Sequence, residues 1–401
     1  MHTDVCVIGN GTIGKALALG LAQAGRNVTL LCPEKLSESG ADAPSLTVAV
    51  APAWDLRVYA VNTAARKLLQ TLKVWDALDA ARIAPVDAMT VYGDGAQAGK
   101  IGFDAYGAHA DALAWIVEDR NLNQALDAAL RFTPNLTLRQ GAAARVDVTA
   151  QQTQVRLADG TTVSAALLVG ADGAHSWVRH QADIGIDYRP YDQRAVVSNF
   201  DCSVAHQGIA YQWFTAEEGI VALLPLPGQR VSLVWSAPTA LAQKLLDEGA
   251  AGIAQRLNAL PGFTLGALTA MQPERVQAID LALIRAHQFT APRLALVGDA
   301  AHVIHPLAGH GMNLGFADVA ALLDILAQPD ATRDCGDARL LARYARARKE
   351  DVLLMQLATD GLARIFSSNF EPLRVARNLG LNLLDKLPLL KRRMMAHAAG
   401  T

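Results

Sequence analysis

The chain has 401 residues, of which 36 are Lys or Arg and 38 are Asp or Glu, so its formal net charge is −2 at pH 7. This length predicts two domains that share a large core, and the near balance of charge excludes a nucleic-acid-binding protein. Hydrophobic residues make up 51% of the sequence. No apolar run reaches the roughly 20 residues of a membrane-spanning helix, so we do not expect an integral membrane protein.

The cysteines are scattered along the chain as Cys6, Cys32, Cys202 and Cys335. None of them belongs to a CxxC pair, which argues against a zinc site or a disulfide framework, and we expect no metal. Isolated thiols are typical of a reducing compartment. The strand pattern begins at Asp4 without a charged leader, so we expect a cytoplasmic protein without a secretory signal.

The first thirty residues carry the pattern of a βαβ unit. Residues 4–8 read as an apolar strand, 13–24 place small and apolar residues at helical spacing, and 27–31 read as a second strand. The crossover between two such strands makes them parallel. The pattern therefore predicts the opening of a doubly wound α/β sheet.

Three glycines in the first turn match the pattern GxGxxG: Gly9, Gly11 and Gly14. Such glycines allow a tight turn, close approach of the backbone to a pyrophosphate, and close packing of helix on strand. The acid that usually follows the second strand is replaced by Cys32. Glu34 lies 20 positions past Gly14, which is the usual interval between the glycine motif and the ribose-binding acid. Its carboxylate either reaches back to a ribose or is solvated at the protein surface.

The middle of the chain mixes helices with short β units. Helices are expected at 62–72 and 122–130, a hairpin over 145–163 around Asp159-Gly160, and a buried strand at 165–169. From 195 to 236 strands and turns alternate, which predicts an antiparallel sheet of a second domain. At residue 294 we expect the chain to return to the first domain and, after the strand and glycine-rich turn that follow, to be helical to its end.

The segment 294–315 is the most informative part of the sequence. An apolar strand places Asp299 at its carboxyl end, and Gly309 and Gly311 let backbone amides approach a flat group before a helix begins at about Met312. This geometry suits a cofactor that carries both hydroxyl groups and an anionic ring edge.

Several segments together carry a resemblance to a known family. They are residues 55–57, 103–105, 116–120, 169–173, 211–226, 298–315, 359–362 and 387–391. With the glycine turn they resemble the FAD-dependent aromatic hydroxylases typified by 4-hydroxybenzoate hydroxylase, and most of all the ubiquinone-biosynthesis branch of that family. The resemblance covers essentially the whole chain.

The resemblance implies a set of FAD-binding residues. They are Gly9, Gly11, Gly14, Glu34, Arg57, Arg120, Asp172, Gly173, Gly298, Asp299, Pro306, Gly309, Gly311, Met312 and Asn313. Asp299 would accept from a ribitol hydroxyl, Arg57 and Arg120 would lie on the cofactor side, and the amides of 311–313 would stabilise negative charge on the reduced ring. Asp172 belongs to a second FAD motif that is also linked to nicotinamide use.

Two residues depart from the pattern of the branch. Cys32 replaces the ribose-binding glutamate, which would cost about 1.5–3 kcal/mol, or roughly ten- to a hundredfold in FAD affinity, unless Glu34 substitutes. His310 stands where the branch usually has glutamine. Its place beside the flavin could alter the flavin potential or the fit of the substrate.

The candidates for a catalytic role are His310 and Pro306. His310 is the best titratable candidate because of its place beside the ring, and Pro306 belongs to the apolar segment that would close the pocket against water. His302 and His305 lie in a turn, where a hydrogen-bonded structural role is favoured.

The activity implied by the resemblance is hydroxylation of the aromatic ring of a polyprenyl phenol or quinol in ubiquinone biosynthesis. The enzyme would use FAD, O2 and either NAD(P)H or a reductase, and would act through a flavin C4a-hydroperoxide. One alternative is a hydroxylase of a soluble aromatic acid, which a clustered arginine pocket would favour. Another is a flavin-poor accessory subunit of a quinone-biosynthesis complex, which the replacement at Cys32 would favour.

The segment 379–395 interleaves leucines with Lys386, Lys391, Arg392 and Arg393. It reads either as an interfacial helix at the inner face of the membrane or as a C-terminal helix packed on the body of the protein.

The expected organisation is an FAD-binding α/β domain interleaved with a smaller antiparallel-sheet substrate domain and followed by a helical C-terminus. The FAD-binding parts are 1–75, 113–185 and 286–340, the substrate-domain parts are 76–112 and 186–285, and the helical region is 341–401.

Overall fold

The structure is a computed structural model that describes residues 2–32, 53–94, 98–326 and 334–367, without the side chains of Ala308, His310 and residues 362–367. Its α-helices in chain order are α1 (Thr12–Gln23), α2 (Thr63–Thr71), α3 (Asp119–Arg131), α4 (Trp177–Gln181), α5 (Thr239–Asn258), α6 (His310–Leu326) and α7 (Ala338–Ser367). Short 3-10 turns lie at Trp75–Ala77, Ala80–Arg82, Gly298–Ala300 and Leu307–Gly309. Helix α6 thus begins two residues before the expected Met312.

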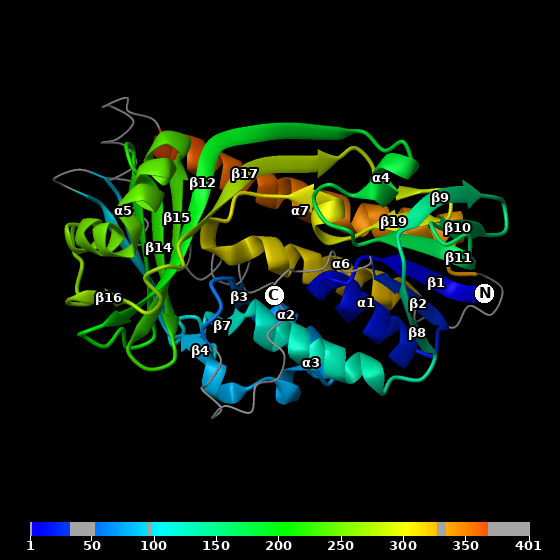
Figure 1. Ribbon diagram of the computed structural model, residues 1–401, viewed down its shortest axis with the longest axis horizontal. Coiled ribbons are helices and arrows are strands. Elements are labelled where there is room, and N and C mark those ends of the chain that lie inside the picture. The colour runs from blue at the N-terminus through cyan, green and yellow to red at the C-terminus, as the bar shows by residue number, and fades with distance from the viewer. Residues whose placement is uncertain (1, 33–52, 95–97, 327–333, 368–401) are drawn as a thin grey trace.

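An eight-stranded sheet forms the half of the molecule that holds the N-terminus (Figure 1). Its order is β18 (Thr290–Ala291), β19 (Leu294–Leu296), β11 (Thr162–Gly170), β1 (His2–Ile8), β2 (Val28–Cys32) and β8 (Leu136–Gln140), and β10 (Thr153–Leu157) joins β11 to β9 (Ala143–Val148). The strands from β19 to β8 are parallel. This confirms the predicted doubly wound α/β class, with β2 one residue later than expected.

A nine-stranded sheet forms the other half. Its order is β20 (His302–Val303), β17 (Gln277–Ala286), β12 (Ile186–Cys202), β15 (Arg230–Pro238), β14 (Gly219–Leu226), β13 (Ile209–Thr215), β5 (Ala88–Tyr92) and β6 (Lys100–Asp104), with β16 (Leu268–Ala270) beside β12. The antiparallel sheet predicted for 195–236 is its centre.

The nine-stranded sheet differs from the prediction in two respects. Strand β5 pairs with β13 in parallel, because the segment 88–104 reaches this sheet from an earlier part of the chain. Strand β20 pairs with β17, in a segment for which the sequence predicted a turn. Backbone pairing across a long sequence separation leaves no trace in local periodicity.

A small sheet lies between the two large ones. It consists of β3 (Val58–Val61), β7 (Ala114–Glu118) and β4 (Ile83–Val86), all antiparallel. The long strands β12 and β17 run along the molecule from the nine-stranded sheet towards the eight-stranded one (Figure 1). The two halves are therefore joined by a continuous ribbon.

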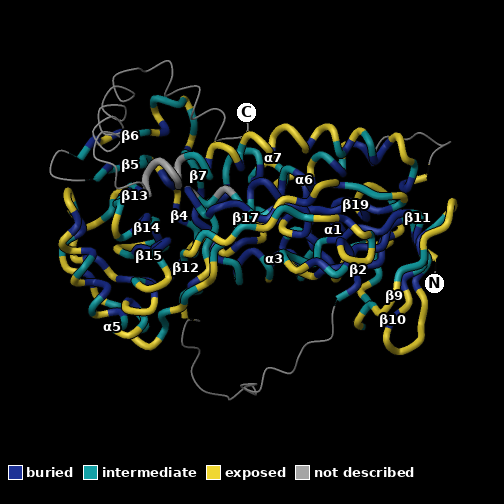
Figure 2. Tube along the Cα trace, turned by 90° about the horizontal axis from the view of Figure 1, so that it is seen from above, coloured by how far each residue is buried: buried dark blue, intermediate teal, exposed yellow. Residues whose placement is uncertain are grey.

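Helices cover the sheets according to their apolar faces. Helix α1 and strands β1 and β11 belong to one large core, and α5 packs on one face of the nine-stranded sheet. Helix α7 has an exposed outer face (Figure 2), on which Leu354 and Leu357 are exposed. None of the helices in the described ranges has a stretch long and apolar enough to cross a bilayer.

Candidate functional site

A cavity of about 1720 Å³ lies where the three sheets meet the start of α6. Most of the residues that the sequence singled out for FAD line this cavity: Gly9, Gly11, Arg57, Asp172, Gly173, Gly298, Asp299, Pro306, Gly309, Gly311, Met312 and Asn313. Gly14 and Arg120 are not among its lining residues. Glu34 and the side chain of His310 lie outside the described part of the chain.

The three glycines of the first turn have different surroundings. Gly9 has φ +119°, and a Cβ there would lie 2.1 Å from the carbonyl oxygen of Ala171, while a Cβ on Gly14 would lie 2.0 Å from that of Gly9. A Cβ on Gly11 would meet nothing within 4 Å. Gly9 and Gly14 are thus needed for packing, whereas Gly11 borders open space where a phosphate can approach backbone amides.

The second glycine turn likewise contains one glycine that is closely packed and one that borders open space. Gly309 has φ +68°, and a Cβ there would lie 3.0 Å from the Cβ of Ala60. A Cβ on Gly311, at the start of α6, would meet nothing within 4 Å. The side chain of Asn313 accepts from the amide of Asn62 at 3.0 Å and donates to the carbonyl of Ala60 at 2.8 Å, which fixes β3 and α2 against α6.

Asp172 organises the turn after β11. Its carboxylate accepts from the hydroxyl of Ser176 at 2.5 Å and from the amide of Val178 at 3.0 Å, so it caps helix α4. The buried guanidinium of Arg179 then donates to the carbonyls of Ala174 and Ala300, both at 2.8 Å. Arg179 thereby joins the turn after β11 to the turn after β19.

Asp299 is exposed where it opens onto the cavity, and the surrounding protein crowds it on its other sides. Burial raises the pKa of its carboxyl group, and His302 and Arg57 act in the opposite direction. Behind it, the fully buried Asp318 of α6 accepts from the amide of Gly298 at 2.8 Å and makes a contact of 2.7 Å with Nε2 of His302.

A cation from the last helix completes this buried cluster. Nε of Arg348, in α7, lies 2.7 Å from the carboxylate of Asp318. Burial alone would raise the pKa of Asp318, but His302 and Arg348 together hold it below its usual range. The turn that presents Asp299 is thus anchored through α6 to α7.

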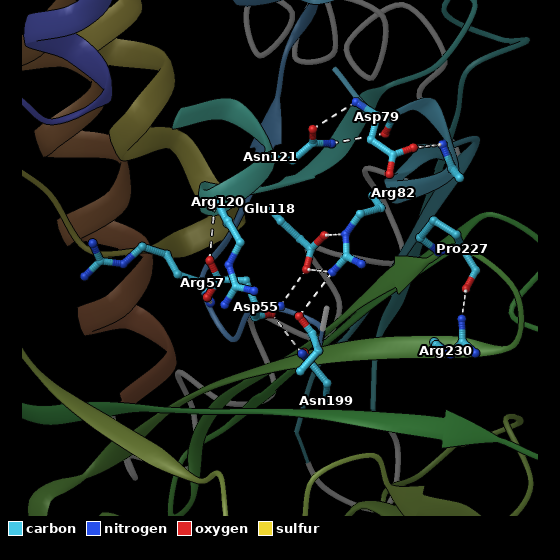
Figure 3. Close-up of polar contacts among 12 residues, drawn as sticks. Asp55, Arg57, Asp79, Arg82, Glu118, Arg120, Asn121, Asn199, Pro227 and Arg230 are labelled. Atoms are coloured by element: carbon cyan, nitrogen blue, oxygen red, sulfur yellow. Dashed lines mark hydrogen bonds and ion pairs between the residues drawn. The ribbon is translucent and has the colours of Figure 1, made fainter. Parts of the chain in front are cut away.

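Arg57 reaches the cavity from a segment that is held by a buried ion pair (Figure 3). Nε and Nη2 of Arg82 lie 2.5 and 2.8 Å from the carboxylate of Glu118, which is 1% exposed. Glu118 also accepts from the amide of Asp55 at 2.5 Å. The carboxylate of Asp55 in turn accepts from the amides of Arg57 and Arg120, at 3.1 and 3.2 Å.

His305 has a structural position beside the cavity. It is fully buried, its Nε2 lies 3.0 Å from the side-chain oxygen of Gln193, and its ring meets Tyr191 edge-on at 4.9 Å. Burial lowers the pKa of His305 to about 4. It is therefore neutral at pH 7.

The half of the cavity away from the glycine turns is lined mainly by apolar side chains. Pro306 and Leu307 form one wall, and Leu307 joins Val91 and Phe214 of the nine-stranded sheet in one apolar cluster. Apolar side chains along the same sheet face continue this surface: Val197, Ala210, Ala222, Leu224 and Val234. Such a face excludes water from any ring bound against it.

Sequence reasoning missed the residues that hold the site together. Asp318 is a charged residue within an otherwise apolar helical stretch, a signal that could have identified it as buried and paired. Arg179, Arg348 and the pair Arg82–Glu118 find partners far along the chain, so no local pattern reveals them.

Comparison with known proteins agrees with this geometry. Residues 102–355, more than half of the chain, match the family described as FAD binding domain. The chain is 37% identical to ubiquinone hydroxylase UbiL of Rhodospirillum rubrum (99% of this chain, 90% of the relative) and 36% identical to 3-demethoxyubiquinol 3-hydroxylase of Escherichia coli (99% and 98%). The structure of Klebsiella pneumoniae HpxO complexed with FAD and uric acid has a TM-score of 0.73 at 19% identity (100% and 96%).

The two glycine turns, the carboxylate at the end of β19 and the open cradle between them define an FAD-binding domain. The chain belongs to the family of FAD-dependent aromatic hydroxylases, together with the ubiquinone hydroxylases. It is accordingly an FAD-dependent monooxygenase.

The open positions at Gly11 and Gly311 fit a bound dinucleotide, because neither backbone is screened by a neighbouring side chain. Gly11 and the start of α1 would hold the pyrophosphate, Asp299 the ribitol hydroxyls, and the amides at the start of α6 the anionic ring edge. When bound, FAD supplies the activation of O2. The chain supplies binding, orientation and a dry apolar wall at Pro306 and Leu307.

Proposed function

We propose that this enzyme hydroxylates the aromatic ring of a polyprenyl phenol or quinol intermediate of ubiquinone biosynthesis, with NAD(P)H as electron donor. One observation carries the proposal: a single cavity joins the FAD cradle to an extended apolar sheet face. A ring with a long hydrocarbon chain needs such a face, because the burial of its chain drives binding. The names of the two relatives refer to the hydroxylation of ubiquinone and of 3-demethoxyubiquinol.

The lining of the cavity supports a site for a flat apolar ring. The wall at Leu307 meets Val91 and Phe214, so a ring beside the flavin would lie between the α6 turn and the sheet. An electron-rich phenol ring held there is shielded from water while it reacts. The protein's contribution is to position this ring and exclude water.

The test uses the purified full chain loaded with FAD. It is supplied with NADH or NADPH, isotopically labelled O2 and the probe 2-geranylphenol, and the products are analysed by mass spectrometry. We expect one labelled oxygen atom in the ring of the probe. The soluble acid 4-hydroxybenzoate serves as comparison, and its hydroxylation in place of the prenylated phenol would contradict the proposal.

A second measurement addresses the electron donor and the presence of flavin. The visible absorption spectrum, recorded before and after addition of FAD, should show stoichiometric flavin that NADH or NADPH bleaches without oxygen. Bleaching by dithionite alone would point to a separate reductase. A protein that takes up no FAD would favour an accessory subunit.

The proposal extends to the membrane surface and to a quinone-biosynthesis complex, because a polyprenyl substrate resides in the bilayer. The segment 379–395 that motivates this lies outside the described residues. Co-sedimentation with anionic vesicles should be lower for a chain that ends at residue 388 than for the full chain. Equal co-sedimentation of the two proteins would remove the idea.

A further inference from the structure

Gln212 lies in the middle of the apolar sheet face that borders the cavity. It belongs to β13, where alternate side chains point to opposite faces of the sheet. Tyr211 and Trp213 pack in the core beneath α5, whereas Ala210 and Phe214 belong to clusters on the opposite face. Gln212 shares the face of Ala210 and Phe214, and it lines the cavity.

The neighbours of Gln212 across the sheet are apolar. The strand register places it beside Val91 of β5 and Ala222 of β14, both of which also line the cavity. Gln212 is only 3% exposed. Within the described ranges, no side chain or backbone group is hydrogen-bonded to its carboxamide.

A carboxamide among apolar side chains costs stability, since its donor and acceptor have no partner in the described protein and reach water only through the cavity. Two other polar side chains that line the cavity are engaged: Asp172 accepts from the first turn of α4, and Asn313 bonds Asn62 and Ala60. A leucine or methionine would fill the position of Gln212 at no such cost. The structure therefore holds a free hydrogen-bonding group where folding alone would favour an apolar one.

The position of Gln212 relative to the flavin side follows from the packing. Leu307, next to Pro306 in the turn before α6, belongs to the same apolar cluster as Val91 and Phe214. Val91 is the cross-strand partner of Gln212, and Phe214 is the next residue on the same face. Gln212 thus borders the apolar cluster that includes Leu307 of the turn before α6.

We propose that Gln212 is a specificity-determining residue whose carboxamide hydrogen-bonds an oxygen substituent on the aromatic ring of the substrate. This inference rests on the proposed function, because it requires a ring bound between the Leu307 wall and the sheet. A carboxamide both donates and accepts, so it can bind a hydroxyl, a phenolate or an ether oxygen. It selects an oxygenated ring over a plain hydrocarbon ring of the same shape.

The test compares two probes and two readouts. The probes are 2-geranylphenol and geranylbenzene, which differ only in the ring hydroxyl, and their dissociation constants are measured from the change in flavin absorption. The wild type should prefer the phenol. In Gln212→Met the dissociation constant of the phenol should rise about 10- to 100-fold, and that of geranylbenzene should stay the same or fall.

The second readout is the thermal midpoint of the apoprotein. Gln212→Met should leave it unchanged or raise it, because the variant removes an unsatisfied polar group; a purely structural role for Gln212 predicts a lower midpoint. Phe214→Leu, an apolar change on the same strand and face, is the matched control and should affect both probes alike. If Gln212→Met does not fold, Gln212→Asn replaces it, since a shorter carboxamide should weaken phenol binding alone.

The outcomes separate this inference from the proposed function. A wild type that prefers the phenol, with a Gln212→Met variant that keeps the same preference, overturns the role of Gln212 and leaves the function standing. A wild type that holds FAD but binds neither probe overturns the proposed function, and the inference with it.

Discussion

The carboxylate of Asp318 accepts a hydrogen bond from the backbone amide of Gly298 at 2.8 Å, although the two residues lie in different elements of the FAD-binding site. The same carboxylate contacts His302 and Arg348, and its side chain is fully buried. The position of the turn that presents Asp299 therefore depends on one carboxylate.

Replacing Asp318 by Ala should lower the free energy of unfolding by about 3–5 kcal/mol, because Arg348 would keep a buried charge without its partner. Urea unfolding measures the change. The matched control is Asp351→Ala: this residue also pairs with Arg348, at 2.9 Å, but its side chain is 62% exposed, so about 0–1 kcal/mol is expected. Equal losses in the two variants would contradict the role of the buried cluster.

The low pKa of Asp318 predicts the direction of its pH effect. A carboxyl group with a lowered pKa in the folded state contributes stability above its unfolded pKa and loses it as pH falls through the folded pKa. The difference in unfolding free energy between wild type and Asp318→Asn should therefore shrink below about pH 4.

His305 should make stability depend on pH in a higher range. Its pKa is lowered to about 4 in the folded protein, so between its ordinary value of 6.5 and 4 the unfolded chain binds a proton that the folded protein does not. As the pH is lowered from 6.5 to 4, the free energy of unfolding should therefore decrease. The decrease should be up to about 3 kcal/mol larger in the wild type than in His305→Gln. Urea unfolding at several pH values tests this, with the exposed His109→Gln as control; parallel curves for wild type and His305→Gln would refute it.

Glycines of the first turn should separate cofactor binding from folding. Gly11→Ala should change apoprotein stability by no more than about 1 kcal/mol, because its Cβ has open space, but should weaken FAD binding about tenfold or more by filling the cradle. Gly9→Ala should destabilise the apoprotein itself, since its Cβ would lie 2.1 Å from a carbonyl oxygen. Calorimetry of the apoprotein and FAD titration measure the two effects; unimpaired FAD binding by Gly11→Ala would count against the cradle.

Asp299 should contribute to FAD affinity more by accepting a hydrogen bond than by its negative charge. Asp299→Asn keeps one oxygen that can accept from a ribitol hydroxyl, so we expect a smaller loss of FAD affinity than for Asp299→Ala, which should lose about 10- to 100-fold. Quenching of flavin fluorescence on binding gives both affinities. A larger loss in the Asn variant would mean that the charge dominates.

The sequence predicted the parts of the fold that depend on local patterns. The glycine turn after residue 8, the hairpin at Asp159-Gly160 and the strand at 294–296 were found because their signals lie within a few residues. The strand pairing of β5 with β13 and of β20 with β17 was missed because it depends on distant segments.

The same limit applies to the site. Residues in motifs, such as Gly11 and Asp299, could be named from the sequence, and the structure places them around one cavity. Arg179 and Arg348 could not, and Gln212, although it lies in a segment that carries the resemblance, was given no role, because burial and the absence or presence of a partner are properties of the packed chain. The roles of Glu34 and His310 stay predictions from sequence.

Strand β19 lies directly beside β11, although the whole segment 186–286 separates them along the chain. The cradle for FAD uses the turn after β1, the turn after β11 and the turn after β19. During synthesis the first of these turns emerges from the ribosome long before the last. For part of this time the nascent chain therefore contains β1 and β11 but not yet β19. Cofactor uptake is consequently a late event, possible only once residues up to the start of α6 have been made.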